Sequence, residues 1–101
     1  MSYELRIHVP ESVDSEVRSE LIEKLTREYG GTTTYEYTGT WVNDQNQVER
    51  ESGHVVTCLL DGVQESAQAA WVRRWYVGWI KENTDERAIM TDIRKTNAVI
   101  Q

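Results

Sequence analysis

Apolar and polar residues alternate with a period of two at the start of the chain, over residues 3–9. Such alternation predicts a half-buried β-strand with one face toward a core. The apolar face would consist of Tyr3, Leu5, Ile7 and Val9. Pro10 should end the strand, because proline has no N–H to donate to a sheet. The polar face would carry Glu4, Arg6 and His8.

Two later segments have apolar residues at helical spacing. The first predicts a helix that is capped by Ser12 and stopped by Gly30-Gly31, with a face made of Val17, Leu21, Ile22, Leu25 and Tyr29. The second predicts a helix over residues 64–83, with a broad stripe made of Ala67, Trp71, Trp75 and Trp79 beside Val72, Tyr76 and Ile80. We expect most of this stripe to face a sheet and one tryptophan to remain at an edge.

Residues 32–42 are rich in Thr, Tyr and Trp, which favour strands. The polar run 43–47 predicts a hairpin tip with Asn46 at positive φ, and the chain should return as a strand through residues 48–60. Apolar and polar residues alternate again over residues 87–93, which predicts a last strand. Residues 94–101 either extend this strand or fray. The order strand, helix, strand, strand, helix, strand predicts a single ferredoxin-like domain over residues 1–101. This is an α+β sandwich with a four-stranded antiparallel sheet and two helices on one face.

Composition limits the function. The 101 residues carry a net charge of −6, which disfavours nucleic-acid binding and fits a partner with a basic surface. No apolar run is long enough to span a membrane, and the N-terminus does not resemble a secretory signal, so we expect a cytoplasmic protein. The single cysteine, Cys58, excludes an internal disulfide and thiolate zinc sites, and its apolar surroundings predict a buried side chain.

The middle of the chain resembles a known family. Gly30-Gly31-Thr32-Thr33-Thr34 is followed by Gly39-Thr40-Trp41, then by Asn46, and then by Glu51 before an apolar strand. This resembles a family of small uncharacterised bacterial and phage proteins with the pattern Gly-Gly-x-Thr, Gly-x-Trp, a turn glycine and a Glu. Asn46 stands where that family has the glycine, and asparagine tolerates the same left-handed backbone. The resemblance implies the ferredoxin-like fold and no particular activity.

His8 and His54 are the only histidines, and both are predicted on neighbouring strands. If both pointed away from the helices, they could lie close together, with Glu36 or Glu51 as an orienting carboxylate for a metal or acid/base site. A pocket near these histidines, Tyr35 and Trp41 would serve a small enzyme or a small-molecule binder. We favour the alternative without a shared site, in which the two histidines face solvent or an interface. The sequence has no phosphate loop, no His-Glu-x-x-His and no Gly-x-Ser-x-Gly, so we predict no catalytic residue, no metal site and no cofactor.

The favoured hypothesis is a non-catalytic interaction module that acts through the open sheet face. Val56, Leu60 and the Thr-rich strand over residues 32–42 would make that face partly apolar, which favours a homodimer or a protein partner with a basic surface. Small acidic proteins of mobile genetic elements often act in this way, so we also consider such an origin. The alternatives are a small-molecule binder or a small enzyme of the dimeric α/β-barrel type. The candidate ligand or interface residues are His8, Tyr35, Tyr37, Trp41, His54, Val56 and Trp79.

Overall fold

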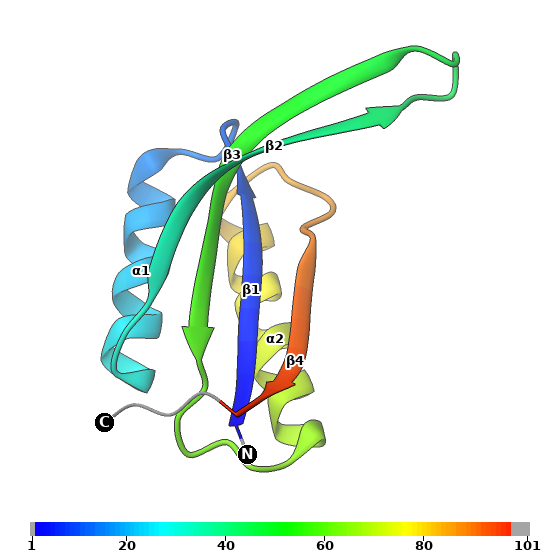
Figure 1. The fold of residues 1–101 in the computed structure, drawn as a ribbon. Helices are drawn as coiled ribbons and strands as arrows, with labels where there is room; N and C mark the ends of the chain where they lie inside the picture. Colours follow the sequence, from blue (N-terminus) through cyan, green and yellow to red (C-terminus); the bar gives the residue numbers. More distant parts are fainter. Residues whose placement is uncertain (1, 98–101) are drawn as a thin grey trace.

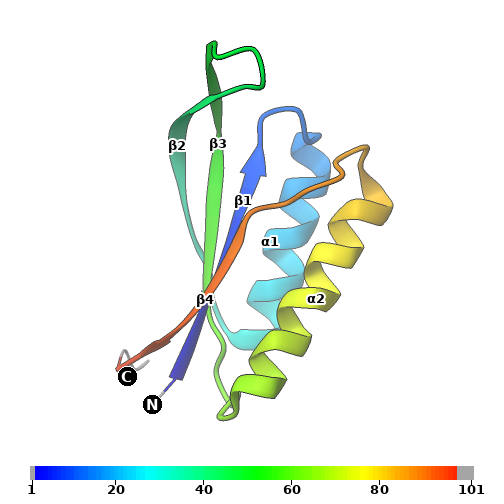
Figure 2. The same cartoon turned by 90° about the vertical axis from the view of Figure 1, so that its right-hand side faces the viewer.

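The computed structural model describes residues 2–97, which form one sheet covered by two helices. The elements are β1 (Ser2–Pro10), α1 (Ser15–Tyr29), β2 (Thr33–Val42), β3 (Val48–Leu59), α2 (Ser66–Asn83) and β4 (Thr91–Thr96). The strands pair in the order β2-β3-β1-β4, and every pairing is antiparallel. Both helices cover the same face and leave the other open (Figure 2). The predicted ferredoxin-like fold is therefore confirmed.

The core lies between the sheet and the helices, as the alternation in β1 predicts. Leu5 and Ile7 of β1 are completely buried, and Arg6 between them lies on the open face. The other completely or almost completely buried core residues come from β1, β3, the helices and the turn after β3: Val9, Leu21, Leu25, Val56, Cys58, Leu60, Ala69 and Ile80. Removal of these side chains from water is the main force that holds the helices on the sheet.

The β2–β3 hairpin is longer than the sheet to which it belongs. Pairing between β1 and β3 ends at Pro10 and Gly53, whereas pairing between β2 and β3 continues to Val42 and Val48. Residues 39–51 therefore form a two-stranded extension, which we call the arm. Figure 1 shows the arm projecting beyond the helices, and the molecule measures 46 × 26 × 23 Å. At the tip, Asn46 has a φ of 60°, as predicted.

The first helix begins later than predicted. The side chain of Asp14, not that of Ser12, accepts a hydrogen bond from the free backbone N–H of Glu16 and caps α1. Ser12 is not at the cap because Val13 N–H bonds back to the Pro10 carbonyl and closes a turn. The predicted end is confirmed: Gly30 has a φ of 99° and its N–H bonds to the Thr26 carbonyl.

The last strand begins at Thr91 and not at Arg87, and it extends to Thr96. The preceding residues run beside β1 without forming a regular strand, although the Met90 carbonyl accepts a hydrogen bond from the His8 N–H at 2.9 Å. Alternation of apolar and polar residues was therefore a poor guide to this boundary. The predicted course of residues 98–101 lies outside the described residues.

The second helix buries a narrower stripe than predicted. Ala69, Val72, Tyr76 and Ile80 are buried, and Trp79 packs at the side of this row. Trp71 and Trp75 remain 59% and 46% exposed, so the expectation of one surface tryptophan was wrong. Each lies one position before a buried residue, about 100° around the helix, and so points away from the sheet.

Candidate functional site

His8 and His54 lie on opposite faces of the sheet. In the register of β1 and β3, His8 pairs with Val55 and His54 pairs with Val9. Neighbouring residues of a strand point to opposite faces, so His54 shares the helix-covered face with Val9, whereas His8 lies on the open face. The site that was considered for both histidines together is therefore not formed, because the condition that they point the same way is not met.

The same register places Val56 in the core. It pairs with Ile7 and is completely buried under the helices, and Leu60 is completely buried as well. The expectation that these two residues make the open face apolar was therefore wrong. Val55, one residue earlier, lies on the open face instead, where neighbouring side chains leave it 2% exposed.

His54 is held by α1. Its Nδ1 lies 3.1 Å from a terminal guanidinium nitrogen of Arg18. Arginine only donates hydrogen bonds, so Nδ1 of His54 accepts this one and the ring proton of a neutral His54 resides on Nε2. His54 thus joins the helix to the sheet beside the core.

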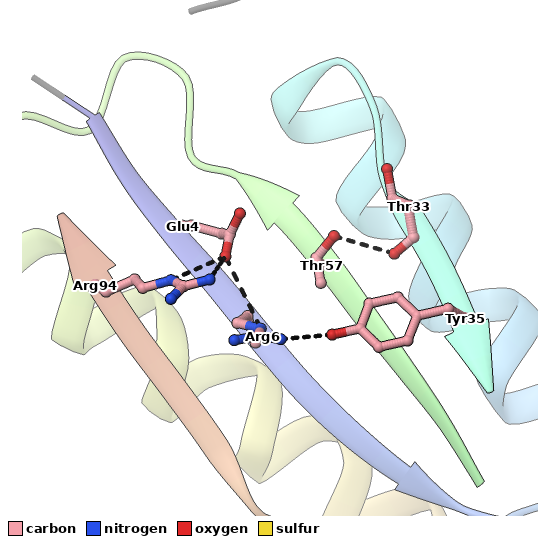
Figure 3. A network of polar contacts seen from close by, with 6 residues as sticks. All are labelled: Glu4, Arg6, Thr33, Tyr35, Thr57 and Arg94. Carbon is pink, nitrogen blue, oxygen red and sulfur yellow. Dashed lines mark hydrogen bonds and ion pairs between the residues drawn. The ribbon is translucent and has the colours of Figure 1, made fainter. Parts of the chain in front are cut away.

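Charged side chains occupy the centre of the open face (Figure 3). A guanidinium nitrogen of Arg6 donates a 2.6 Å hydrogen bond to the Tyr35 hydroxyl. The Glu4 carboxylate forms an ion pair with a guanidinium nitrogen of Arg94 at 3.3 Å. The same carboxylate oxygen lies 3.9 Å from Nε of Arg6. The Tyr35 hydroxyl, and secondarily the negative charges of Glu4 and Asp92, raise the pKa of Arg6, so this guanidinium stays charged. The centre of the face is thus a polar network that includes Tyr35, in which Nε of Arg6 is buried without a hydrogen-bond partner and lies 3.9 Å from Glu4.

An open pocket of about 680 Å³ lies beside this network, at the base of the arm. We call it the arm pocket. It lies between the open face of the β2–β3 hairpin and the segment before β4, and its main residues are His8, Tyr37, Gly39, Trp41, Glu51 and Met90. Three of the predicted candidates therefore share a site: His8, Tyr37 and Trp41. Tyr35 lies further along β2, and His54, Val56 and Trp79 do not line it.

Tyr37 is the central side chain of the arm pocket. Its ring meets the His8 ring edge to face, with 5.0 Å between the centroids and 67° between the planes. It also lies over Gly53, its cross-strand partner, where an added Cβ would come within 2.9 Å of a Tyr37 ring carbon. Burial, and then the nearby Glu51 carboxylate, raise the pKa of Tyr37. The Tyr37 hydroxyl is therefore protonated at neutral pH, and its hydrogen bond to the Glu51 carboxylate contributes to the same shift.

A slot opens on β2 between Tyr37 and Trp41. Residues 37, 39 and 41 share a face, and Gly39 in the middle has no side chain and no neighbouring atom within 4 Å of the place where a Cβ would lie. Glu51 stands directly opposite Gly39 in the register. Both aromatic residues were predicted as candidates, whereas Glu51 was considered only as a partner of the histidines. A hairpin tip at 43–47 would have predicted that pairing.

The remaining predicted residues have structural roles. Trp79 packs beside the core under the ammonium group of Lys24, which lies 5.4 Å from its ring centroid. Cys58 is buried, which raises its thiol pKa to about 12, and its Sγ donates to the Gly31 carbonyl at 3.4 Å. A thiol with this pKa is almost entirely un-ionised at neutral pH, which makes it a poor nucleophile.

The two edges of the sheet differ. β4 is six residues long and carries Asp92, Arg94 and Lys95, charges of the kind that discourage pairing with another strand. β2 is ten residues long, with Glu36 as its only charged residue and without proline, and every residue pairs one to one with β3, so no bulge bends it. Trp41, Val42 and Val48 at the far end of this hairpin are 44%, 60% and 69% exposed.

The fold is similar to solved structures at low sequence identity. A phage SAM lyase in complex with S-methyl-5'-thioadenosine has a TM-score of 0.66 at 13% identity, over 93% of this chain and 81% of that one. A variant of CutA1 from Pyrococcus horikoshii gives 0.61 at 12% identity, over 98% and 87%. A DUF3240 family protein from Shewanella baltica gives 0.55 at 8% identity, over 99% and 94%.

These similarities establish the fold alone. No protein-family model matches the chain, and no curated protein does either. The Gly-Gly-x-Thr and Gly-x-Trp resemblance therefore stays a prediction, although one structural neighbour belongs to a family designated only by number. Within residues 2–97, no group of three or more His, Cys, Asp or Glu could hold a metal ion, and no described helix is long and apolar enough to cross a membrane.

Proposed function

We propose that this protein is a non-catalytic interaction module that forms a homodimer through the free edge of β2. The observation that carries the proposal is the long, unprotected β2 edge, of which the arm is the half that β1 does not support through β3. From the sequence, we expected the interface on the open face. The polar network there favours the edge instead, because its charged groups already pair with one another.

The arm lacks a third strand to stabilise it within the monomer. Its two strands pair only with each other, because β1 ends at the level of Gly53. An isolated two-stranded hairpin is marginally stable in water, and a third strand or a packed face is usually needed. A second copy of the chain would supply that strand. Two β2 edges related by a twofold axis run antiparallel and would join two four-stranded sheets into one.

The backbone hydrogen bonds show which groups are available. Asn43 and Gln47 are hydrogen-bonded across the tip, and the pairing register stays constant along the hairpin. Hydrogen-bonded and non-hydrogen-bonded pairs alternate in an antiparallel ladder, so the odd-numbered residues of β2 bond to β3. The even-numbered residues, among them Thr38 and Thr40, point their N–H and C=O groups toward the free edge.

A substitution at Thr40 tests this arrangement. Thr40→Pro removes an N–H that points to the free edge and leaves the β2–β3 hydrogen bonds in place, so each monomer should fold. Thr40→Val is the matched control, because it keeps the N–H and suits a strand. Light scattering over a concentration series should show a dimer for the natural chain and for Thr40→Val, and a monomer for Thr40→Pro, with circular dichroism as the check on folding.

A natural chain that stays monomeric at every concentration would refute the proposal. A folded Thr40→Pro variant that still dimerises would show that the interface lies elsewhere. In the first case, the next hypothesis is a different protein with a basic surface, which the net charge of −6 favours.

A further inference from the structure

The side chains of the arm pocket are not needed for pairing of two β2 edges. Pairing of β2 edges would occupy backbone groups in the plane of the sheet, whereas the arm pocket opens on the sheet face. Its volume of about 680 Å³ is within the range of about 300–1,000 Å³ that small-molecule sites occupy. The arm pocket can therefore accept a ligand independently of dimerisation.

Two aromatic side chains and a carboxylate define the slot. Tyr37 and Trp41 stand on either side of Gly39, and Glu51 lies opposite the gap. Glu51 is the only Asp, Glu, Lys or Arg among the described residues that line the arm pocket. Aromatic faces attract cations through the negative charge above the ring, and tryptophan does so most strongly.

Neighbouring charges add to this attraction. Glu49 pairs with Trp41 across the hairpin, and its carboxylate accepts a 3.2 Å hydrogen bond from the Asn43 side chain, which holds it on the arm. The negative charge of Glu86 also acts on Tyr37 and contributes to its raised pKa. Arg50 pairs with Thr40 on the other face of the hairpin, so its charge does not point into the slot.

We propose that the slot of Tyr37, Gly39, Trp41 and Glu51 binds the ammonium head of a small organic cation. The ammonium group would lie over Gly39, between the two aromatic side chains and against the Glu51 carboxylate. The pocket is several times larger than such a head group, and Ile89 and Met90 line its far side. An apolar body attached to the cation would lie against these two residues.

Three probes test the two parts of the ligand. Benzyltrimethylammonium carries both head and body, tetramethylammonium carries only the head, and benzyl alcohol has a similar body without charge. We expect benzyltrimethylammonium to bind most tightly and benzyl alcohol most weakly. The readout is the NMR signal of each indole N–H: Trp41 should shift with the probe, whereas Trp71, Trp75 and Trp79 should not.

Two variants remove one feature each. Glu51→Gln keeps the shape and removes the charge, and it should weaken binding of benzyltrimethylammonium by roughly fivefold or more. Gly39→Val fills the floor of the slot and should abolish binding. It is expected to fold, because no atom lies within 4 Å of the new Cβ and valine suits a strand. Glu36→Gln is the matched control, since it removes the same charge from the opposite face of β2 and should bind like the natural chain.

The proposal is wrong if Trp41 does not respond to benzyltrimethylammonium, or if all four indoles respond equally. It is also wrong if Glu51→Gln and Glu36→Gln weaken binding to the same extent, because the effect would then reflect net charge alone. Unchanged binding by a folded Gly39→Val variant would place the cation outside the slot.

Discussion

At the scale of single residues, Gly53 shows how closely the base of the arm is packed. It lies where β1 ends, under the ring of Tyr37 and beside the backbone of Val9 and Pro10. An added Cβ would lie 2.3 Å from the Val9 carbonyl oxygen and 2.9 Å from the Pro10 Cα. Backbone atoms cannot move aside as a flexible side chain can, so this position requires glycine for reasons of space.

We therefore expect Gly53→Ala to lower the free energy of unfolding by roughly 1–3 kcal/mol, the usual cost of overpacking. Gly78→Ala is a control of opposite sign. Gly78 lies within α2 with no atom near the added Cβ, so alanine should stabilise the protein by about 0.5–1 kcal/mol. Urea denaturation measures both. A neutral Gly53→Ala would mean that β1 and β3 separate easily at the base of the arm.

At the scale of elements, the hairpin has two parts with different support. The half near Thr33 lies in the sheet and pairs through β3 with β1, whereas the arm has no third strand. Local stability follows the number of buried contacts, so the arm should open more readily than the body. If a second copy pairs with β2, the arm gains the support that it lacks in the monomer.

Hydrogen exchange can detect this gain residue by residue. In dilute monomer, the amides of Thr38, Thr40 and Val42 should exchange rapidly, because they point to the free edge. At concentrations where the chain dimerises, their exchange should slow by about tenfold or more. The amide of Lys95 on the charged edge strand β4 is the control and should not change with concentration. Equal slowing at both edges would contradict pairing through β2.

At the scale of the whole molecule, charge and shape act on association in opposite directions. The radius of gyration is 14.3 Å, larger than the value of about 13 Å typical for this length, as the arm leads one to expect. Each chain carries a net charge of −6, so two copies repel each other at long range. Glu36 is the only charged residue of β2, so electrostatic repulsion at the proposed interface itself is small.

Dimerisation should therefore strengthen when salt screens this repulsion. We expect the dimer dissociation constant to fall severalfold between about 20 mM and about 300 mM NaCl, because the Debye length shortens over this range. Sedimentation equilibrium at several salt concentrations gives the constant directly. A dimer that weakens with salt would indicate an interface held by ion pairs between copies, in which case the β2 edge is the wrong surface.

Local sequence patterns determined the elements and one of the three strand pairings. The alternation in residues 3–9, the helical spacing of Leu21 and Leu25, and the Gly30 stop describe structure that depends on near neighbours along the chain. The pairing of β2 with β3 belongs to the same class, because a short tip at 43–47 joins them and determines their register.

Only the tertiary structure decided how β1 meets β3. A whole helix and strand separate them along the chain, so no local turn sets their register, and a shift by one residue reverses every side chain. The observed register pairs His8 with Val55, which separates the two histidines and places Val56 in the core. The same packing of distant segments brings Met90 and His8 beside Tyr37, Gly39 and Trp41. The arm pocket exists because strands far apart in sequence share one face, a relation that no local pattern encodes.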